Sequence, residues 1–402
     1  INGMMNVIIN EGLVDKEFIA NCTEGYEAMA EVVAKYTPEY VEKITTVPAD
    51  DIRKAARIYA QSEAAVICYA MGLTQHSTGT DNVKSICNLA MLTGNIGRPG
   101  TGVDPLRGQN NVQGACDMGG LPVTYPGYQA VTNEAVRAKF EAAWGVPLSP
   151  NNGLTLTETI NKAHEGQIKA LVVIGENPMM SDPDLHHVEE ALEKLDFLVV
   201  QDIFLTETAR YADVVLPGVT FAEKDGTFTN TERRVQRVRK AIDPIDGAKP
   251  DWQIICELAT RMGYPMHYNS PEEIFEEMKA LTPSYAGMSY ARLEGRGLQW
   301  PCPSADHPGT QFLHKDGKFT RGKGLFSAIE FKEPRELPDE EYPLILTTGR
   351  NLYHYHTGTM TRRSVALDKH VPEAELEINP QLAAKMGIQD GEKVRLSTRR
   401  GS

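Results

Sequence analysis

The chain has 402 residues, 41% of them hydrophobic and 24% charged, an ordinary composition for about two to four folded domains. Its formal net charge of −13 argues against broad binding to nucleic acids or to anionic membrane surfaces. No apolar run approaches the roughly 20 residues of a membrane span, and Ile1–Met4 lacks the basic start of a signal peptide. We therefore expect a cytoplasmic protein without nucleic-acid binding or direct membrane insertion.

The cysteines lie far apart, and no two of them have the CxxC spacing of iron–sulfur or zinc sites. They are Cys22, Cys68, Cys87, Cys116, Cys256 and Cys302. We expect scattered thiols in a reducing compartment. The sequence therefore predicts no metal ligands in this chain.

The first hundred residues predict an α/β lobe. Two helical patterns, a short apolar strand and a third helix follow one another before a run rich in glycine and proline ends the last helix. Their ranges are 17–36, 52–61, 64–71 and 81–93, and the run that ends them is 94–100. Ala49–Asp51 caps the second helix and places acids in its first turn.

Residues 101–165 are rich in glycine, asparagine, glutamine and proline and predict loops. A second α/β unit follows, in which strands and helices alternate and therefore predict a parallel sheet. The strands are 170–174, 197–201 and 213–216, and the helices are 184–195 and 206–211. Ligands of such sheets bind beyond the carboxyl ends of the strands, where the polar runs 175–177, 201–206 and 217–230 fall.

The last third of the chain changes character. Residues 270–335 have weak periodicity and predict excursions over a surface, and from Tyr342 the pattern becomes β. The expected strands are 343–348, 374–378 and 393–397, with a helix from Asn379–Pro380 to Gly387. The sequence begins without an initiator Met, and the final Arg399–Ser402 is a turn without a returning strand, so we expect the chain to be cut at both ends.

The loop Pro105–Ala115 carries one fixed cation, four amide side chains and two glycines. Arg107 offers a planar fork of donors that suits a small carboxylate. Amides such as Gln109 and Gln113 can order a substrate or a heterocycle, and the glycines let backbone approach a ligand closely. A polar surface loop is the ordinary alternative.

Polar residues and glycines also follow the predicted strands. Gly72, Thr74 and Gln75 follow the strand 64–71, and Gly175, Glu176 and Asn177 follow the strand 170–174. Gln201 and Asp202 lie at the end of the strand 197–201, and Glu223 to Arg234 come after the strand 213–216. An acid after a strand can accept hydrogen bonds from ribose hydroxyls or guanine N–H groups. The GxGxxG fingerprint is missing, so a conventional NAD site is not supported. Ordinary turns, helix caps and a charged hairpin are the alternatives.

Near the C-terminus Thr347–Arg350 is followed by His354, Tyr355 and His356. Two histidines at i and i+2 would lie on one face of a strand and could bind a metal. Because no third ligand is nearby, hydrogen bonding to an anionic or heterocyclic ligand is the favoured interpretation.

Together these segments resemble the molybdopterin oxidoreductase family, and within it the catalytic (alpha) subunits of formate dehydrogenases. The strongest stretches stand in family order and are Met71–Gln75, Asn88–Gly127, Val200–Pro217, Asp251–Tyr264 and Thr348–Arg350. The resemblance implies an α/β fold with two Rossmann-like parallel-sheet lobes and a partial C-terminal β-barrel. The implied parts are 1–109, 110–272, a connecting region 273–335, and the pterin-covering barrel 336–402.

The resemblance also implies two molybdopterin guanine dinucleotides around one molybdenum or tungsten. The second lobe would hold one nucleotide through Gly175, Glu176, Asn177, Gln201, Asp202, Thr206, Glu223 and Gly226. The first lobe would hold the other near Gly72, Thr74 and Gln75, with Arg107 and Gln109 beside the pterins. The barrel would cover the pterins through Arg350, His354 and Tyr355, and Arg107 matches the substrate-orienting arginine of the family.

The implied reaction is the two-electron oxidation of formate to CO₂, or its reverse, in anaerobic metabolism. The partners would be electron-transfer subunits or a hydrogenase-type complex. The four-iron four-sulfur cluster and the Cys or selenocysteine metal ligand would precede residue 1, so we expect the chain alone to be inactive. Two alternatives stay open: another substrate such as nitrate, or a non-catalytic structural subunit, which the presence of Glu176, Asp202, Arg107 and Arg350 disfavours.

Overall fold

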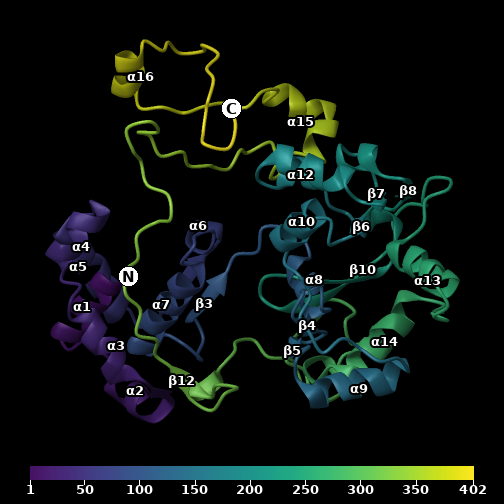
Figure 1. Cartoon of the computed structure of the whole chain (residues 1–402). Coiled ribbons are helices and arrows are strands. Elements are labelled where there is room, and N and C mark those ends of the chain that lie inside the picture. The colour runs from purple at the N-terminus through teal and green to yellow at the C-terminus, as the bar shows by residue number, and fades with distance from the viewer. The chain divides into compact units, whose positions relative to one another are not determined.

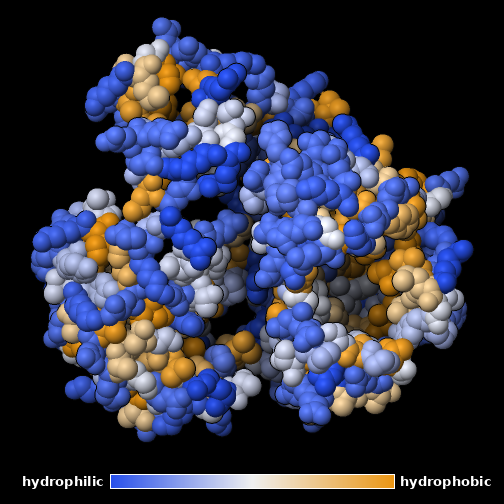
Figure 2. Space-filling view, viewed as in Figure 1, coloured by the Kyte–Doolittle hydropathy of each residue, from blue (hydrophilic) through white to orange (hydrophobic).

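The computed structural model describes all 402 residues (Figure 1). By their internal contacts they form two compact units. Unit 1 comprises Ile1–Leu148, Thr227–Arg237 and Glu272–Leu337, and unit 2 comprises Ser149–Gly226, Val238–Pro271 and Pro338–Ser402. The chain therefore passes between the units several times. No helix is both long enough and apolar enough to cross a bilayer, and the face seen in Figure 2 is mostly hydrophilic, with scattered apolar residues.

Helices dominate the first part of unit 1. They are α1 (Asn2–Asn10), α2 (Lys16–Cys22), α3 (Tyr26–Val33), α4 (Pro38–Thr45), α5 (Ala49–Gln61), α6 (Met71–Thr74) and α7 (Gly79–Leu92). Apolar faces of α1, α3, α5 and α7 bury one core, which includes Ile8, Met29, Ala56 and Leu92. Burial of such faces, rather than helix propensity, stabilises short helices. The predicted helices at 52–61 and 81–93 are confirmed.

The single helix predicted over 17–36 is wrong. The structure has α2, then the short strand β1 (Thr23–Glu24), then α3. Gly25 separates them with a left-handed φ of 81°, and a Cβ there would lie 2.9 Å from the carbonyl oxygen of Phe326. A left-handed residue interrupts a right-handed helix, and the interruption lets β1 pair in parallel with β12 (Gly324–Leu325).

The predicted strand 64–71 is confirmed as β2 (Val66–Tyr69), which pairs in parallel with β3 (Gly102–Pro105). Residues 101–165 are less loop-rich than predicted. They include α8 (Val112–Asp117), β4 (Thr124–Tyr125), β5 (Gln129–Ala130), α9 (Glu134–Trp144) and α10 (Leu156–His164). Each of the two longer helices buries only a narrow stripe, such as Phe140 in α9 and Ile160 with Ala163 in α10, so their polar faces conceal the periodicity.

The strands β4 and β5 form an antiparallel pair, and a three-stranded sheet that lies mostly in unit 1 has the order β11-β10-β9. Its strands are β9 (Gly226–Thr229), β10 (Arg234–Val238) and β11 (Leu298–Gln299), and α14 (Pro271–Leu281) follows in the chain after β10. A second core of unit 1 gathers Val235, Phe275, Tyr285, Met288 and Leu293. It shows that residues 273–335 contribute buried side chains to unit 1 rather than only surface excursions.

Unit 2 is built on a three-stranded parallel sheet with the order β6-β7-β8. The strands are β6 (Ala170–Ile174), β7 (Phe197–Asp202) and β8 (Val214–Pro217), and the helices around them are α10, α11 (Pro178–Ser181), α12 (Leu185–Glu193) and α13 (Asp251–Arg261). Val188 and Leu192 of α12 share a core with Ile160 of α10 and with Leu198 and Val200 of β7. The predicted parallel sheet and its helix at 184–195 are confirmed.

Residues 338–402 of unit 2 contain no strand, so the strands predicted at 343–348, 374–378 and 393–397 are wrong in this structure. A strand needs a neighbouring strand for its backbone hydrogen bonds, and these segments have none; Ile345 stays 79% exposed. The helix predicted from Asn379 is confirmed as α16 (Pro380–Met386). The remaining short elements are η1 (Thr208–Tyr211), η2 (Phe221–Glu223), η3 (Pro283–Tyr285), η4 (Lys315–Gly317), η5 (Thr361–Arg363) and α15 (Val365–His370).

Candidate functional site

The loops that follow β6, β7 and β8 bring several predicted residues together at one end of the sheet of unit 2. Gly175 turns the chain directly after β6 with a φ of 62°, and its N–H donates to the carbonyl of Gln201 at 2.9 Å. No atom lies within 4 Å of the place where a Cβ of Gly175 would sit. The turn is therefore open to a ligand, as expected at the carboxyl ends of parallel strands.

Carboxylates that are partly or fully buried follow this turn. Glu176 accepts a hydrogen bond from Ser181 through Oε1, but its Oε2 and the Oδ2 of Asp182 are buried without any partner. Burial raises the pKa of Glu176, and the neighbouring charges of Asp182 and Asp202 raise it further. Burial likewise raises the pKa of Asp182 and of Asp202. The site thus has acceptor atoms that lack donors.

Asn177 has a different role, because the protein itself uses the whole amide. Its Oδ1 accepts from N and Oγ1 of Thr208 at 3.1 and 2.8 Å, and its Nδ2 donates to Glu207 at 2.8 Å and to Thr359 at 3.0 Å. Thr206 is fully buried, and its hydroxyl accepts from the N–H of Ala209 at 3.2 Å. Both donors and the acceptor of the Asn177 amide are engaged, and the Thr206 hydroxyl holds the backbone of Ala209, so both side chains shape the turns.

Glu223 is also occupied by the protein. Its Oε2 accepts from N and Oγ1 of Thr220 at 2.8 and 2.9 Å, and its Oε1 accepts from the N–H of Ile245 at 3.3 Å. Hydrogen bonds from Thr220 lower the pKa of Glu223. Gly226, three residues later, has open space around its Cα. Glu223 therefore closes a capping box, whereas Gly226 leaves room for an approaching group.

The structure adds residues that the sequence reasoning did not select. Buried Gln201 donates through Nε2 to Asp251 Oδ1 at 2.7 Å, and Lys224 forms an ion pair with the same carboxylate. Asp251 is the first residue of α13, where the helix dipole favours an acid. The sequence therefore gave no further reason to expect that Asp251 also binds Gln201 and Lys224.

Arg363 is the other addition. Its Nη2 lies 3.6 Å from Glu207 Oε2, its guanidinium lies 5.1 Å from the ring centre of Phe204, and its charge lowers the pKa of Asp202 against the larger effect of burial. The pair Arg362–Arg363 is a visible basic cluster in the sequence, but the sequence does not show that it reaches the end of β7.

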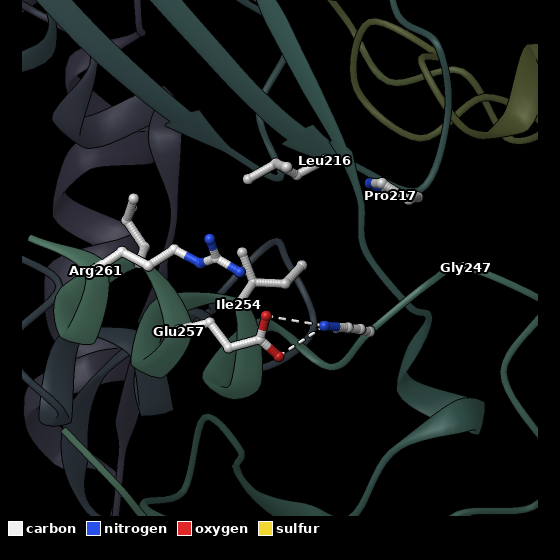
Figure 3. A pocket seen from close by; sticks show the side chains of 8 residues that line it. Leu216, Pro217, Gly247, Ile254, Glu257 and Arg261 are labelled. Atoms are coloured by element: carbon white, nitrogen blue, oxygen red, sulfur yellow. Dashed lines mark hydrogen bonds and ion pairs between the residues drawn. The ribbon is translucent and has the colours of Figure 1, made fainter.

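A cavity of about 250 Å³ lies beside the end of β8 (Figure 3). Apolar side chains of Leu216 and Ile254 line it, and Lys249 Nζ pairs across its edge with both carboxylate oxygens of Glu257 at 2.7 and 2.9 Å. Arg261 adds a second cation. None of the residues that the sequence selected for cofactor binding lines this cavity.

The C-terminal residues of the predicted site lie in an irregular segment of unit 2. Arg350 is exposed, and His354 is buried with Nδ1 at 3.1 Å from Thr361 Oγ1 and Nε2 at 2.7 Å from the carbonyl of Val371. Tyr355 N–H donates to Thr361 Oγ1 at 3.1 Å. Both ring nitrogens of His354 are therefore engaged, which disfavours metal ligation, and no cluster of three or more His, Cys, Asp or Glu side chains is arranged to hold a metal ion.

In unit 1, the residues selected after β2 form an exposed turn. Gly72 and Thr74 lie in α6, Gln75 follows it, and all three are exposed. No atom lies within 4 Å of a Cβ built on Gly72. His76 caps the turn, with Nε2 at 2.9 Å from the carbonyl of Gly72. The end of β2 is thus also open.

Arg107 and Gln109 lie exposed in the loop between β3 and α8 of unit 1. Arg107 Nε donates to Gln113 Oε1 at 3.0 Å, while its Nη1 and Nη2 make no hydrogen bond or ion pair. Asn111 adopts a left-handed φ of 62° and accepts from the N–H of Thr229 at 2.9 Å. A Cβ on Gly114 would lie 2.1 Å from that accepting Asn111 oxygen, so the loop closes only because this residue is glycine.

Comparison with protein families identifies the class of this chain. Residues 1–261 match the family model described as molybdopterin oxidoreductase, and residues 344–402 match the molybdopterin dinucleotide binding domain. The chain belongs to the molybdopterin oxidoreductase family, as the resemblance of its motifs predicted. A molybdopterin dinucleotide with molybdenum is the cofactor that these matches imply. The partnerless carboxylate oxygens and the open glycine turn in unit 2 fit such a group, because guanine and ribose present N–H and O–H donors.

Several curated relatives are named formate dehydrogenases. The chain is 55% identical over 404 residues to the F420-dependent formate dehydrogenase subunit alpha of Methanocaldococcus jannaschii, covering 100% of this chain and 60% of that protein. It is 46% identical over 408 residues to formate dehydrogenase H of Escherichia coli, covering 100% and 57%. The chain thus spans less than two thirds of the length of either relative.

Among solved structures, acetylene hydratase from Pelobacter acetylenicus is similar with a TM-score of 0.71 and 24% sequence identity. The match covers 97% of this chain and 58% of that chain. At this level of identity the likeness concerns the fold alone, and it agrees with a mixed α/β architecture.

Proposed function

We propose that this chain is part of the catalytic subunit of a formate dehydrogenase, which oxidises formate to CO₂ or catalyses the reverse reaction. The observation that carries the proposal is the state of Arg107. Its two terminal nitrogens have no protein partner, while Nε is held by Gln113. A guanidinium with two free, coplanar donors matches the two oxygens of a carboxylate.

The proposed cofactor is a pair of molybdopterin guanine dinucleotides with molybdenum or tungsten. In unit 2, Gly175, Glu176, Gln201, Asp202 and Gly226 would contact one dinucleotide. Asn177, Thr206 and Glu223, whose side chains are engaged within the protein, would keep the surrounding turns in shape. In unit 1, Gly72, Thr74, Gln75 and Gln109 would contact the other, and Arg350, His354 and Tyr355 would lie at the pterins.

The chain's own residues supply binding and orientation. Oxidation of formate releases CO₂, one proton and two electrons, and the bound cofactor supplies the two-electron redox chemistry. Arg107 binds both formate oxygens and thereby directs the C–H bond away from the guanidinium. Gln113 keeps the guanidinium plane fixed through Nε, so that formate binds in one orientation.

The proposal extends to the whole protein. It includes a four-iron four-sulfur cluster in a preceding region, a barrel completed around residues 336–402, and the division into parts at residues 109, 272 and 335. It also includes a cytoplasmic location and partner subunits that accept the electrons. The Methanocaldococcus jannaschii relative is named an alpha subunit, which supports the need for partner subunits.

The test uses the full-length protein. Metal analysis should find molybdenum or tungsten, and formate should reduce an artificial dye. Nitrate reduction without formate oxidation would favour the alternative substrate, and the absence of both metal and activity would favour a structural subunit.

A further inference from the structure

Four donor groups converge on the carboxylate of Asp117, which is 0% exposed in unit 1. Its Oδ1 accepts from Gln113 Nε2 at 2.8 Å and from the Tyr128 hydroxyl at 2.9 Å. Its Oδ2 accepts from the Tyr285 hydroxyl at 2.5 Å and from Trp300 Nε1 at 2.7 Å. These donors are all neutral, and a carboxylate can accept about four hydrogen bonds, so the group is fully occupied.

Gln113 connects this buried carboxylate to Arg107. Its Nε2 donates to Asp117, with Tyr128 Oη also 2.8 Å away, and its Oε1 accepts from Arg107 Nε. A carboxylate only accepts and a guanidinium only donates, so the amide has one permitted orientation between them. Gln113 is itself buried, with 5% of its surface exposed.

The hydrogen bond from Arg107 Nε to Gln113 determines which edge of the guanidinium is left to bind a ligand. A guanidinium can bind a carboxylate through Nε and one Nη, or through both Nη atoms. Because Gln113 occupies Nε, the edge formed by Nη1 and Nη2 is the one left without partners.

We propose that Asp117 is a positioning residue for substrate: through Gln113 it fixes Arg107 so that Nη1 and Nη2 together bind the two oxygens of formate. This inference rests on the proposed function. Tyr285, Trp300 and Tyr128 hold the carboxylate, the carboxylate fixes the amide, and the amide fixes the arginine. Asp117 contacts neither substrate nor cofactor in this scheme.

The first experiment compares Asp117→Asn with the double variant Asp117→Asn/Gln113→Glu in the full-length, cofactor-loaded enzyme. The single variant places an amide donor among donors. In the double variant the amide at position 117 accepts from Tyr285 and Trp300 and donates to the carboxylate at position 113, which also accepts from Tyr128 and Arg107. Every pairing then has a donor and an acceptor again, and the net charge matches that of the native protein.

We expect Asp117→Asn to lower kcat/KM for formate by about 10²-fold, the loss typical of a misplaced binding group. The formate Kd, measured without electron acceptor from ¹³C-formate line broadening, should rise about tenfold or more. The double variant should recover roughly tenfold of the lost kcat/KM, which a purely structural role would not predict. Asp50→Asn, an exposed carboxylate on α5, serves as the control and should leave both constants unchanged.

A folded, metal-loaded Asp117→Asn enzyme with native kcat/KM and native formate Kd would overturn the inference. If this variant does not fold, Gln113→Met decides, because it removes the connection and leaves Asp117 with Tyr128, Tyr285 and Trp300. Native formate affinity in Gln113→Met would equally overturn it. If the native enzyme itself neither binds nor oxidises formate, the proposed function fails, and that outcome is separate from an unaffected variant of an active enzyme.

Discussion

The two candidate sites of this chain differ in the polarity of their unused atoms. At the strand ends of unit 2, the unused atoms are acceptors, the buried Oε2 of Glu176 and Oδ2 of Asp182. In the Arg107 loop of unit 1, the unused atoms are donors, the two Nη atoms of one guanidinium. A donor-bearing ligand such as guanine suits the first site, and a small carboxylate suits the second. Fold alone would not make this distinction, because both sites follow strands of parallel pairs.

The largest expected effect comes from removing the donors of unit 1. Arg107→Ala should lower formate turnover about 10²–10³-fold, comparable with the loss of a transition-state donor in other enzymes. Metal and dinucleotide content of the full-length enzyme should stay near the native level. Dye-linked formate oxidation and metal analysis on the same preparation measure both quantities.

Arg107→Lys is the matched control for charge. A lysine keeps the cation but has no pair of coplanar donors, so we expect most of the activity to remain lost. Near-native turnover in either variant would show that Arg107 does not bind the substrate. The proposed difference between a donor site in unit 1 and an acceptor site in unit 2 would then be lost.

The acceptors of unit 2 should govern cofactor retention instead. Glu176→Gln or Asp202→Asn places an N–H donor where the bound group would present its own donors. One lost hydrogen bond to a charged group corresponds to about 1.5–3 kcal/mol, or roughly 10- to 150-fold in affinity. Guanine nucleotide released from purified protein by acid should fall relative to protein, whereas a full nucleotide content in both variants would contradict the assignment.

Asn177→Ala sharpens the comparison, because this residue shapes the site without a free polar atom. The variant removes the amide oxygen that accepts hydrogen bonds from N and Oγ1 of Thr208. The loss of this buried acceptor should lower the free energy of unfolding by about 1–3 kcal/mol. Chemical denaturation of the full-length protein measures the change. Asn133→Ala, at the exposed N-cap of α9, is the control. An equal loss of unfolding free energy in both variants would show that Asn177 contributes no more than an ordinary helix cap.

The smallest effect concerns pH. Burial raises the pKa of Asp182, so its charged form is disfavoured in the folded protein. The folded protein then binds the proton more tightly than the unfolded chain, and Asp182 reduces stability as pH rises from its ordinary pKa of about 4 through the raised value. Asp182→Asn should therefore stabilise cofactor-free protein more at pH 7 than at pH 4. A difference in Tm that shrinks with rising pH would contradict this sign.

The sequence predicts best where local pattern and tertiary environment agree. The alternation at 170–216 has apolar strands, polar ends and helices between them, and the structure confirms the three strands and the helix at 184–195. The helix predicted at 206–211 is a shorter 3-10 helix, Thr208–Tyr211. The same pattern placed Glu176 and Asp202 at the strand ends, because strand direction alone determines which end they occupy.

The sequence predicts poorly where a distant contact decides. Gly25 divides a helical pattern because Phe326 lies against it, and no local signal marks that contact. The apolar run at 343–348 predicts a strand, but a strand also needs a neighbouring strand, which the local sequence pattern does not reveal. The hydrogen bonds of the Asn177 amide within the protein were also not predicted, because its partners Thr208 and Thr359 lie 31 and 182 residues away in the sequence.

Gly114 has a practical consequence for anyone who diversifies the Arg107 loop. Because a methyl group there would overlap the Asn111 oxygen that anchors the loop to Thr229, a saturation library should tolerate exchange at exposed Gln109 far better than at position 114. Such a library, sorted for folded protein without any selection for turnover, would reveal the geometric constraint on the loop separately from its chemistry.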